Sequence, residues 1–321
     1  MESIPPRSPA PSRRTFLHQT AKAAAFLATA PTLGTVVRAS GRGQTTWTLE
    51  AVEVQESFAD GSTVPFFRFL PLAGTPVRGR LPLLEATEGT MVTLTIVNRL
   101  QIPIRPGVVG VGAGPRIAPG ATVSLSFRML PAGSYVFREA AYSQISGVLG
   151  LAAALVSRPS SGLNELWNGG PTFDREYILH YQDSDQRWND AAAMLTFPNL
   201  SVYEPNFFTV NGLSYPDTSA DPDTLIGCQM GERVLLRLSN AGHMRQAIHF
   251  HGYHVDIAAR NNVANTMLPP KDTVEVASGS TTDVILTVNQ TGLYPVHPHS
   301  LTAVTANGLY PYGQLTLISA T

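Results

Sequence analysis

Polar and apolar residues alternate along two stretches that lie far apart in the chain. The first runs from Glu88 to Asn98 (EGTMVTLTIVN) and the second from Gly231 to Asn240 (GERVLLRLSN). Alternation over this length is typical of a β-strand, and each stretch opens with a Gly/Glu turn and ends at an asparagine. We therefore predict two equivalent strands in two copies of one unit.

Further matches extend this internal repeat. Residues 118–127 (APGATVSLSF) resemble 277–286 (ASGSTTDVIL), and residues 132–135 (AGSY) resemble 291–294 (TGLY). Both copies consist of short apolar runs and turns, without a convincing segment of helical period. We predict an all-β protein built from two tandem Greek-key β-sandwich domains.

Composition shifts suggest the domain limits. We place domain one at residues 46–159, a Ser-, Gly- and Asn-containing linker at 160–173, and domain two at 174–321. Within domain two, residues 183–199 form an insertion in which we expect one helical turn. Its position on the fold is left open.

Composition and charge exclude several classes of protein. The 321 residues include 27 Gly and 25 Pro, which suits many turns, and 22 basic residues nearly balance 23 acidic ones. A chain with a formal net charge of only −1 has no field to hold nucleic acid, so we expect no nucleic-acid partner. The single cysteine, Cys228, excludes an intramolecular disulfide and a Cys-rich metal site, and we expect it to be a small buried apolar residue.

The N-terminal residues have the features of an export signal. Arg13 and Arg14 precede Phe16 and Leu17, a weakly apolar run ends near Val37, and small residues follow. This resembles a twin-arginine signal peptide covering residues 1–39. The apolar run is too short to span a bilayer, so we expect no membrane span and a periplasmic or secreted mature protein.

Histidine supplies the candidate chemistry. Four of the eight histidines form two H-x-H pairs, His249 with His251 and His297 with His299. Residues two apart on a strand share a face, so each pair can direct two imidazoles toward one metal or toward neighbouring metals. Imidazole suits copper, zinc, iron and nickel, and copper(II) binds nitrogen ligands most tightly among these divalent ions.

These pairs lie in motifs that resemble a known family. Domain two is similar to the C-terminal cupredoxin domain of multicopper oxidases, and the whole chain resembles two-domain laccases and copper nitrite reductases. The resemblance rests on residues 207–216 (FFTVNGLSYP), 231–234 (GERV), 248–254 (IHFHGYH) and 292–299 (GLYPVHPH), and in domain one on 131–135 (PAGSY) and 147–150 (GVLG). It implies cupredoxin-like domains, in which H-x-H pairs serve a three-copper cluster supplied with electrons by a blue copper.

The chain departs from the family pattern at its other ligand positions. Gln246, Pro298 and Ala303 stand where the resemblance places the two histidines and the cysteine of the blue copper. The positions in domain one that match the two H-x-H pairs carry Gly107, Val109, Arg138 and Ala140. The resemblance thus implies neither a blue copper nor a complete cluster. Arg138 and Glu139 either point into the former cluster cavity or form a solvated pair.

The retained histidines define the expected site. In the family the residues matching His251 and His297 approach the same copper, so we expect these two to bind metal, with His249 or His299 completing the shell. One copper ion, or at most two, is expected per chain. We expect His254 to lie outside the shell, and His180 and His243 to be structural.

Two functions remain open. The first is an exported copper-binding oxidoreductase acting on an unidentified small molecule at this reduced site. The second is a non-catalytic periplasmic scaffold with the multicopper oxidase fold. The resemblance also implies a possible homotrimer, in which domain one of one subunit would cover the histidines of the next with a lid that lacks metal ligands.

Overall fold

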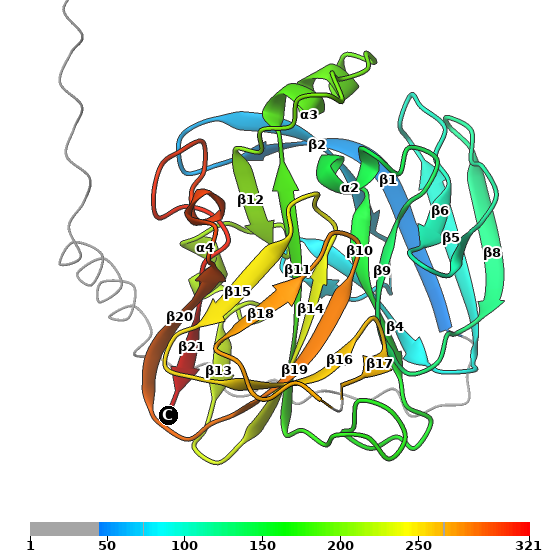
Figure 1. Ribbon diagram of the computed structural model, residues 1–321. Coiled ribbons are helices and arrows are strands. Elements are labelled where there is room, and N and C mark those ends of the chain that lie inside the picture. The colour runs from blue at the N-terminus through cyan, green and yellow to red at the C-terminus, as the bar shows by residue number, and fades with distance from the viewer. Residues whose placement is uncertain (1–44, 73, 266) are drawn as a thin grey trace, which may run out of the picture. The chain divides into compact units, whose positions relative to one another are not determined.

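The computed structural model describes residues 45–72, 74–265 and 267–321. The predicted signal peptide lies outside the described residues. Nearly all regular structure is β, and the sheets form two sandwiches, which confirms the predicted fold class (Figure 1). None of the helices in the described ranges is long and apolar enough to cross a bilayer.

The first sandwich contains two sheets. One has the order β2-β1-β5-β8, and the other has the order β3-β4-β10-β9-β6-β7. Their strands are β1 (Thr45–Ser57), β2 (Thr63–Pro71), β3 (Val77–Arg78), β4 (Leu81–Thr87), β5 (Met91–Asn98), β6 (Pro106–Val108), β7 (Gly112–Ala113), β8 (Thr122–Arg128), β9 (Gly133–Glu139) and β10 (Ala152–Arg158). Trp47, Leu94 and Phe137 are among the buried residues between these sheets.

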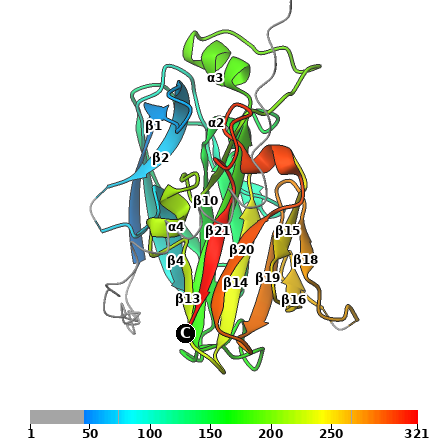
Figure 2. The same ribbon diagram turned by 90° about the vertical axis from the view of Figure 1, so that its left-hand side faces the viewer.

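The second sandwich repeats this arrangement. Its first sheet has the order β12-β11-β14-β19-β16-β17, and the other, which we call the histidine sheet, has the order β13-β21-β20-β15-β18. The strands are β11 (Arg175–Ser184), β12 (Phe207–Val210), β13 (Ile226–Cys228), β14 (Arg233–Asn240), β15 (Gln246–Phe250), β16 (Val255–Arg260), β17 (Val263–Ala264), β18 (Thr273–Val276), β19 (Thr281–Thr287), β20 (Gly292–Pro298) and β21 (Thr316–Ala320). Figure 2 shows the two sandwiches side by side.

Asn98 and Asn240 explain why the repeat keeps an asparagine at the end of the strand. The Asn98 amide donates to the carbonyls of Ile102 and Ile117, and its Oδ1 accepts from the backbone N–H of Leu100. Asn240 makes the same set of bonds in the second sandwich, to Met244, Val276 and Gly242. Each buried asparagine therefore ties the turn that follows its strand to a neighbouring segment of the same sandwich.

The structure contains short helices and one longer helix. They are α2 (Ser146–Leu149), α3 (Gln186–Ala193), α4 (Asp217–Ala220) and the 3-10 turn η1 (Leu301–Val304). The insertion therefore carries the eight-residue α3 rather than one turn. Asp185 caps it by accepting from the N–H of Arg187, and Trp188 is buried in the core of the first sandwich.

Candidate metal centre

The register of the histidine sheet places its H-x-H pairs together. His249 of β15 lies directly opposite His297 of β20, and the flanking pairs are Ile248 with Pro298 and Phe250 with Val296. Ile248, Phe250 and Val296 all belong to the core of the second sandwich. Because side chains alternate between the faces of a strand, His249 and His297 lie on the outer face, away from that core.

The four imidazole rings form one cluster. The centroid of His249 lies 4.6 Å from that of His251, 4.7 Å from that of His299 and 6.0 Å from that of His297. The closest polar approach joins Nε2 of His251 to Nε2 of His297, 2.9 Å apart. The structure therefore brings all four predicted residues together and directs two ring nitrogens at each other.

The other ring nitrogens of two histidines are tied to the backbone. Nδ1 of His249 lies 3.1 Å from the carbonyl oxygen of Asp272 and 3.1 Å from the Thr273 hydroxyl. Nδ1 of His297 lies 2.9 Å from the carbonyl oxygen of Pro298. A carbonyl only accepts, so each Nδ1 carries the proton and Nε2 keeps its lone pair, as is usual for metal-binding histidines.

Sequence reasoning missed Asp272 and Thr273. Thr273 reaches His249 because β18 pairs with β15 at that residue, although the two are 24 positions apart in the chain. The Asp272 carboxylate also approaches, with Oδ2 3.8 Å from Nδ1 of His249. The pairing register is the only signal for these contacts, and a single sequence does not reveal it.

The environment favours neutral rings. Burial, together with the neighbouring rings of His297, His249 and His299, lowers the pKa of His251 to about 4. Burial also lowers the pKa of His297, while its hydrogen bond to the Pro298 carbonyl opposes that shift. Neutral imidazole is the form that binds metals, so neither ring carries a second proton near neutral pH.

The pair of nitrogens fits a metal ion better than the full cluster does. When two imidazole nitrogens bind one metal at about 2.0–2.1 Å with an angle of about 90° at the metal, the nitrogens lie about 2.9 Å apart. The His251 and His297 Nε2 atoms have this separation. Within the described ranges, no three His, Cys, Asp or Glu side chains are already arranged to hold a metal. A third ligand therefore requires the ring of His249 or His299 to turn about its side-chain bonds.

The remaining histidines lie outside the cluster. His180 is buried, its Nδ1 contacts the Ser239 hydroxyl at 2.8 Å, and burial together with Arg68 lowers its pKa to about 3. His243 packs edge-on against Trp188 and Tyr203, and its Nε2 contacts the Gln144 carbonyl. His254 is exposed, and no metal-binding geometry involves it among the described residues.

The positions expected for a blue copper are buried and hold no strong ligand. Gln246 is fully buried, and neither of its amide atoms has a hydrogen-bond partner among the described residues. Pro298 and Ala303 are buried as well. Cys228 packs in the core of the second sandwich, as expected for a small apolar residue, and burial raises the pKa of its thiol to about 11.

The positions in the first sandwich that match the H-x-H pairs make contacts that stabilise the fold. Gly107 pairs with Arg138 across β6 and β9, and Val109 packs against a small apolar cluster of Val136, Ala152 and Ala241. Glu139 does not form a solvated pair with Arg138. Its buried carboxylate accepts from the backbone N–H groups of Arg105, Ala141 and Tyr142 and so holds the segment at Arg105 against the turn that follows β9.

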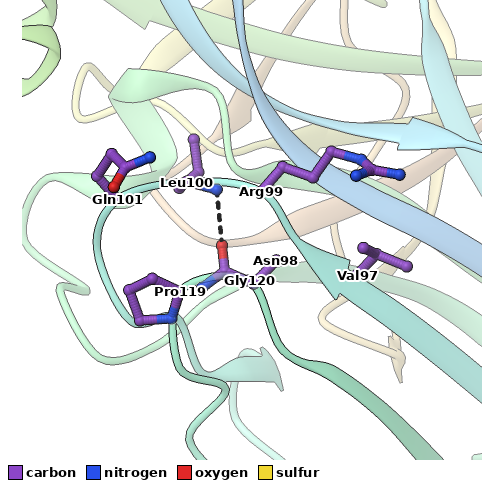
Figure 3. Close-up of a pocket in the computed structure, with 7 residues that line it drawn as sticks. All are labelled: Val97, Asn98, Arg99, Leu100, Gln101, Pro119 and Gly120. Carbon is purple, nitrogen blue, oxygen red and sulfur yellow. Dashed lines mark hydrogen bonds between the residues drawn. The ribbon is translucent and has the colours of Figure 1, made fainter.

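A hollow of about 410 Å³ lies elsewhere, in the first sandwich, between the segments 97–101 and 119–120 (Figure 3). The Asn98 side chain there accepts from the N–H of Leu100, and Arg99 pairs with Glu50 at 2.5 Å. The polar groups that line this hollow are thus bonded to other groups of the protein, and the histidine cluster remains the candidate site.

Comparisons with known proteins concern the fold and the family resemblance. Residues 189–311 match the model of the multicopper oxidase family. A blue copper oxidase from Nitrosomonas europaea superposes with a TM-score of 0.71 at 23% identity, over 87% of this chain and 86% of that one. A copper nitrite reductase from Nitrosomonas europaea gives 0.66 at 19% identity, over 87% and 94%.

A laccase from Botrytis aclada gives a TM-score of 0.62 at 18% identity, over 86% of this chain and 52% of that one. No curated protein sequence matches the chain. Identities at this level establish the fold, and the family match covers part of the second sandwich together with α3. The protein is a two-domain, cupredoxin-like β-sandwich protein similar to multicopper oxidases and copper nitrite reductases.

Proposed function

We propose that the protein is an exported copper-binding oxidoreductase whose site consists of second-domain histidines and lacks a blue copper. The observation that carries the proposal is the approach of His251 Nε2 to His297 Nε2 at 2.9 Å, with Nδ1 of His297 bonded to a carbonyl. His251 and His297 would hold the copper, and His249 or His299 would complete the shell. One ion, or at most two, would bind per chain.

Bound copper would supply one-electron redox chemistry and an open coordination position. The chain's own residues orient the ligands. The Asp272 carbonyl and the Thr273 hydroxyl hold the His249 ring, and the Pro298 carbonyl holds that of His297. Because the cluster lies on the outer face of the histidine sheet, a small-molecule substrate can approach from the side opposite the core.

The replaced positions support a reduced site. Gln246, Pro298 and Ala303 offer no thiolate or imidazole for a blue copper. Gly107, Val109, Arg138 and Ala140 likewise supply no strong ligands from the first sandwich. A complete three-copper cluster is therefore not part of the proposal.

Export and assembly complete the proposal. The paired arginines at 13 and 14 support twin-arginine export to the periplasm or beyond. The outward position of the histidines supports a homotrimer in which a neighbouring subunit covers them and restricts water. We also propose that the two domains span residues 46–159 and 174–321.

A specific observation keeps the scaffold as a second candidate. The segment that follows α3 exposes several large apolar side chains, which is a common feature of protein-binding surfaces. They are Met194, Leu195, Phe197, Leu200 and Val202. A scaffold would retain its cellular role after replacement of all four clustered histidines, whereas the proposed oxidoreductase would lose it.

Copper analysis of the purified mature protein tests the proposal. We expect about one copper per chain after loading and removal of excess metal, and loss of most of it in the His251→Ala/His297→Ala variant, because that pair supplies the converging nitrogens. His254→Ala is the matched control, since it removes an exposed histidine outside the cluster.

Two results would reject the copper site. One is less than about 0.2 copper per chain in the loaded wild-type protein. The other is equal copper content in the double variant and the His254→Ala control. Circular dichroism of each variant confirms that the fold is retained.

A further inference from the structure

The edge strand β8 of the first sandwich offers free backbone groups to solvent. It ends the sheet β2-β1-β5-β8, and Figure 1 shows it outside β5. Just beyond the strand, the backbone N–H of Met129 donates to the carbonyl of Thr90. Because bonded residues alternate along an antiparallel pair, residues 123, 125 and 127 also bond to β5. The N–H and C=O groups that point away from the sheet belong to residues 122, 124, 126 and 128, which are exposed.

The sequence of β8 does not block a further strand. Native sheets commonly protect an edge with a lysine, a proline or a bulge. The strand (TVSLSFR) contains neither lysine nor proline, and its register with β5 is continuous. Val123 and Phe127 pack against the core of the first sandwich and yet remain partly exposed. A second strand at this edge would therefore cover apolar surface as well as bond to the backbone.

The strand is complementary to itself in the antiparallel direction. With Leu125 opposite Leu125 of a second copy, all seven residues pair. Ser124 then faces Ser126, hydroxyl against hydroxyl. Val123 faces Phe127, a β-branched residue against an aromatic one, and such cross-strand pairs stabilise sheets. In this register the free backbone groups meet each other, so about eight main-chain hydrogen bonds can form.

Charge favours the antiparallel direction. Arg128 is the single charged residue of β8, and its guanidinium donates to the Gly89 carbonyl at 3.1 Å. In the antiparallel pair the two Arg128 residues lie at opposite ends, about 20 Å apart, where salt screens their repulsion. A parallel pair would set them side by side. We propose that two copies of this chain associate through antiparallel pairing of their β8 strands.

The pairing extends a ladder of hydroxyl groups on the outer face of the sheet. The hydroxyls of Thr95 and Ser124 lie 2.8 Å apart, and those of Thr93 and Ser126 lie 3.1 Å apart. Each row continues across the contact, since Ser124 of one copy meets Ser126 of the other. The contact is two-fold and lies on the first sandwich, so it does not depend on the histidine sheet or on copper.

Cysteine cross-linking tests the register. Leu125→Cys sets two thiols opposite each other, because facing residues that are not hydrogen-bonded have Cα atoms about 4.5 Å apart, within reach of a disulfide. Val123→Cys is the matched control, since the two copies of residue 123 lie about 14 Å apart in this register. Cys228 is buried and does not compete. Under mild oxidation we expect a covalent dimer of Leu125→Cys and none of Val123→Cys.

Sedimentation equilibrium of the mature protein supplies the independent measurement. We expect an even number of chains in the wild-type assembly and half that number in Ser124→Pro. Proline removes an N–H that faces the second copy and no bond to β5, so the fold is retained, which circular dichroism checks. A wild-type monomer or trimer, or an assembly that Ser124→Pro leaves unchanged, overturns the proposal. Equal cross-linking of the two cysteine variants also overturns it.

Discussion

Single residues set how closely the two sandwiches approach each other. A Cβ atom at Gly147 of α2 would lie 2.2 Å from the carbonyl oxygen of Ala241, which belongs to the second sandwich. We expect Gly147→Ala to lower the free energy of unfolding by about 1–3 kcal/mol, because backbone atoms must move to admit the methyl group. Urea denaturation measures this loss.

Gly227→Ala is the control, because a Cβ there meets its nearest neighbour, the Tyr177 hydroxyl, at an ordinary 3.5 Å. Equal destabilisation of both variants would contradict the close approach inferred at Gly147.

At this scale the sequence predicts part of the site. Alternation along the strands placed His249 with His251 and His297 with His299 on common faces, and the structure brings the four rings together. The contact of His249 with Thr273 depends instead on the register between two strands. Such a register follows from packing over the whole sheet, which local patterns do not specify.

At the scale of elements, α3 is the feature that local patterns describe least well. It lies in the second half of the chain, yet Trp188 is only 4% exposed within the core of the first sandwich, and Asn189 donates to the carbonyl of Pro65. Figures 1 and 2 show α3 at one end of the strands. An eight-residue helix is marginal alone, so its stability comes from a surface that is distant in sequence.

We expect Trp188→Ala to cost about 3–5 kcal/mol of folding free energy, because it removes a large buried side chain. Phe197→Ala, on the segment after α3, is the control because Phe197 is 71% exposed. Chemical denaturation compares the two variants, and a loss at Phe197 as large as that at Trp188 would show that α3 does not anchor the first core.

In contrast, the repeated strands were predictable. The stretches ending at Asn98 and Asn240 are β5 and β14, and both asparagines make equivalent bonds. Their sequence pattern is local. In β5 it coincides with burial of alternate residues, whereas β14 is buried along nearly its whole length.

At the scale of the whole molecule, largely buried ion pairs join the sandwiches. Arg158 of β10 contacts Glu176 of β11 at 2.5 Å, and Arg237 of β14 contacts the same carboxylate at 2.6 Å. Burial alone would raise the pKa of Glu176, but Arg158 and Arg237 outweigh it and lower this pKa to about 2. The carboxylate therefore remains ionised in the folded protein at pH values where it is protonated in the unfolded chain.

This predicts how stability depends on pH. Above about pH 4.5 Glu176 is ionised in both states, and its full contribution is present. As the pH falls toward 2 the unfolded chain binds the proton first, so the contribution, about 3 kcal/mol at most, is progressively lost. Glu176→Gln should lower stability at pH 6 and reduce its decline from pH 5 to pH 3.

Urea denaturation across this pH range provides the measurement. Glu53→Gln, which alters an exposed carboxylate, should follow the wild-type curve. An identical pH dependence for Glu176→Gln and the wild-type protein would contradict the proposed role of these ion pairs.

The proposed copper site also belongs to the scale of the whole molecule, since it requires the folded histidine sheet and the outer face of that sheet. Anomalous diffraction at the copper absorption edge, from copper-loaded crystals of the mature protein, tests it most directly. We predict a copper peak at about 2.0–2.1 Å from Nε2 of both His251 and His297. A peak bound to other residues, or no peak at the histidine sheet, would contradict this account.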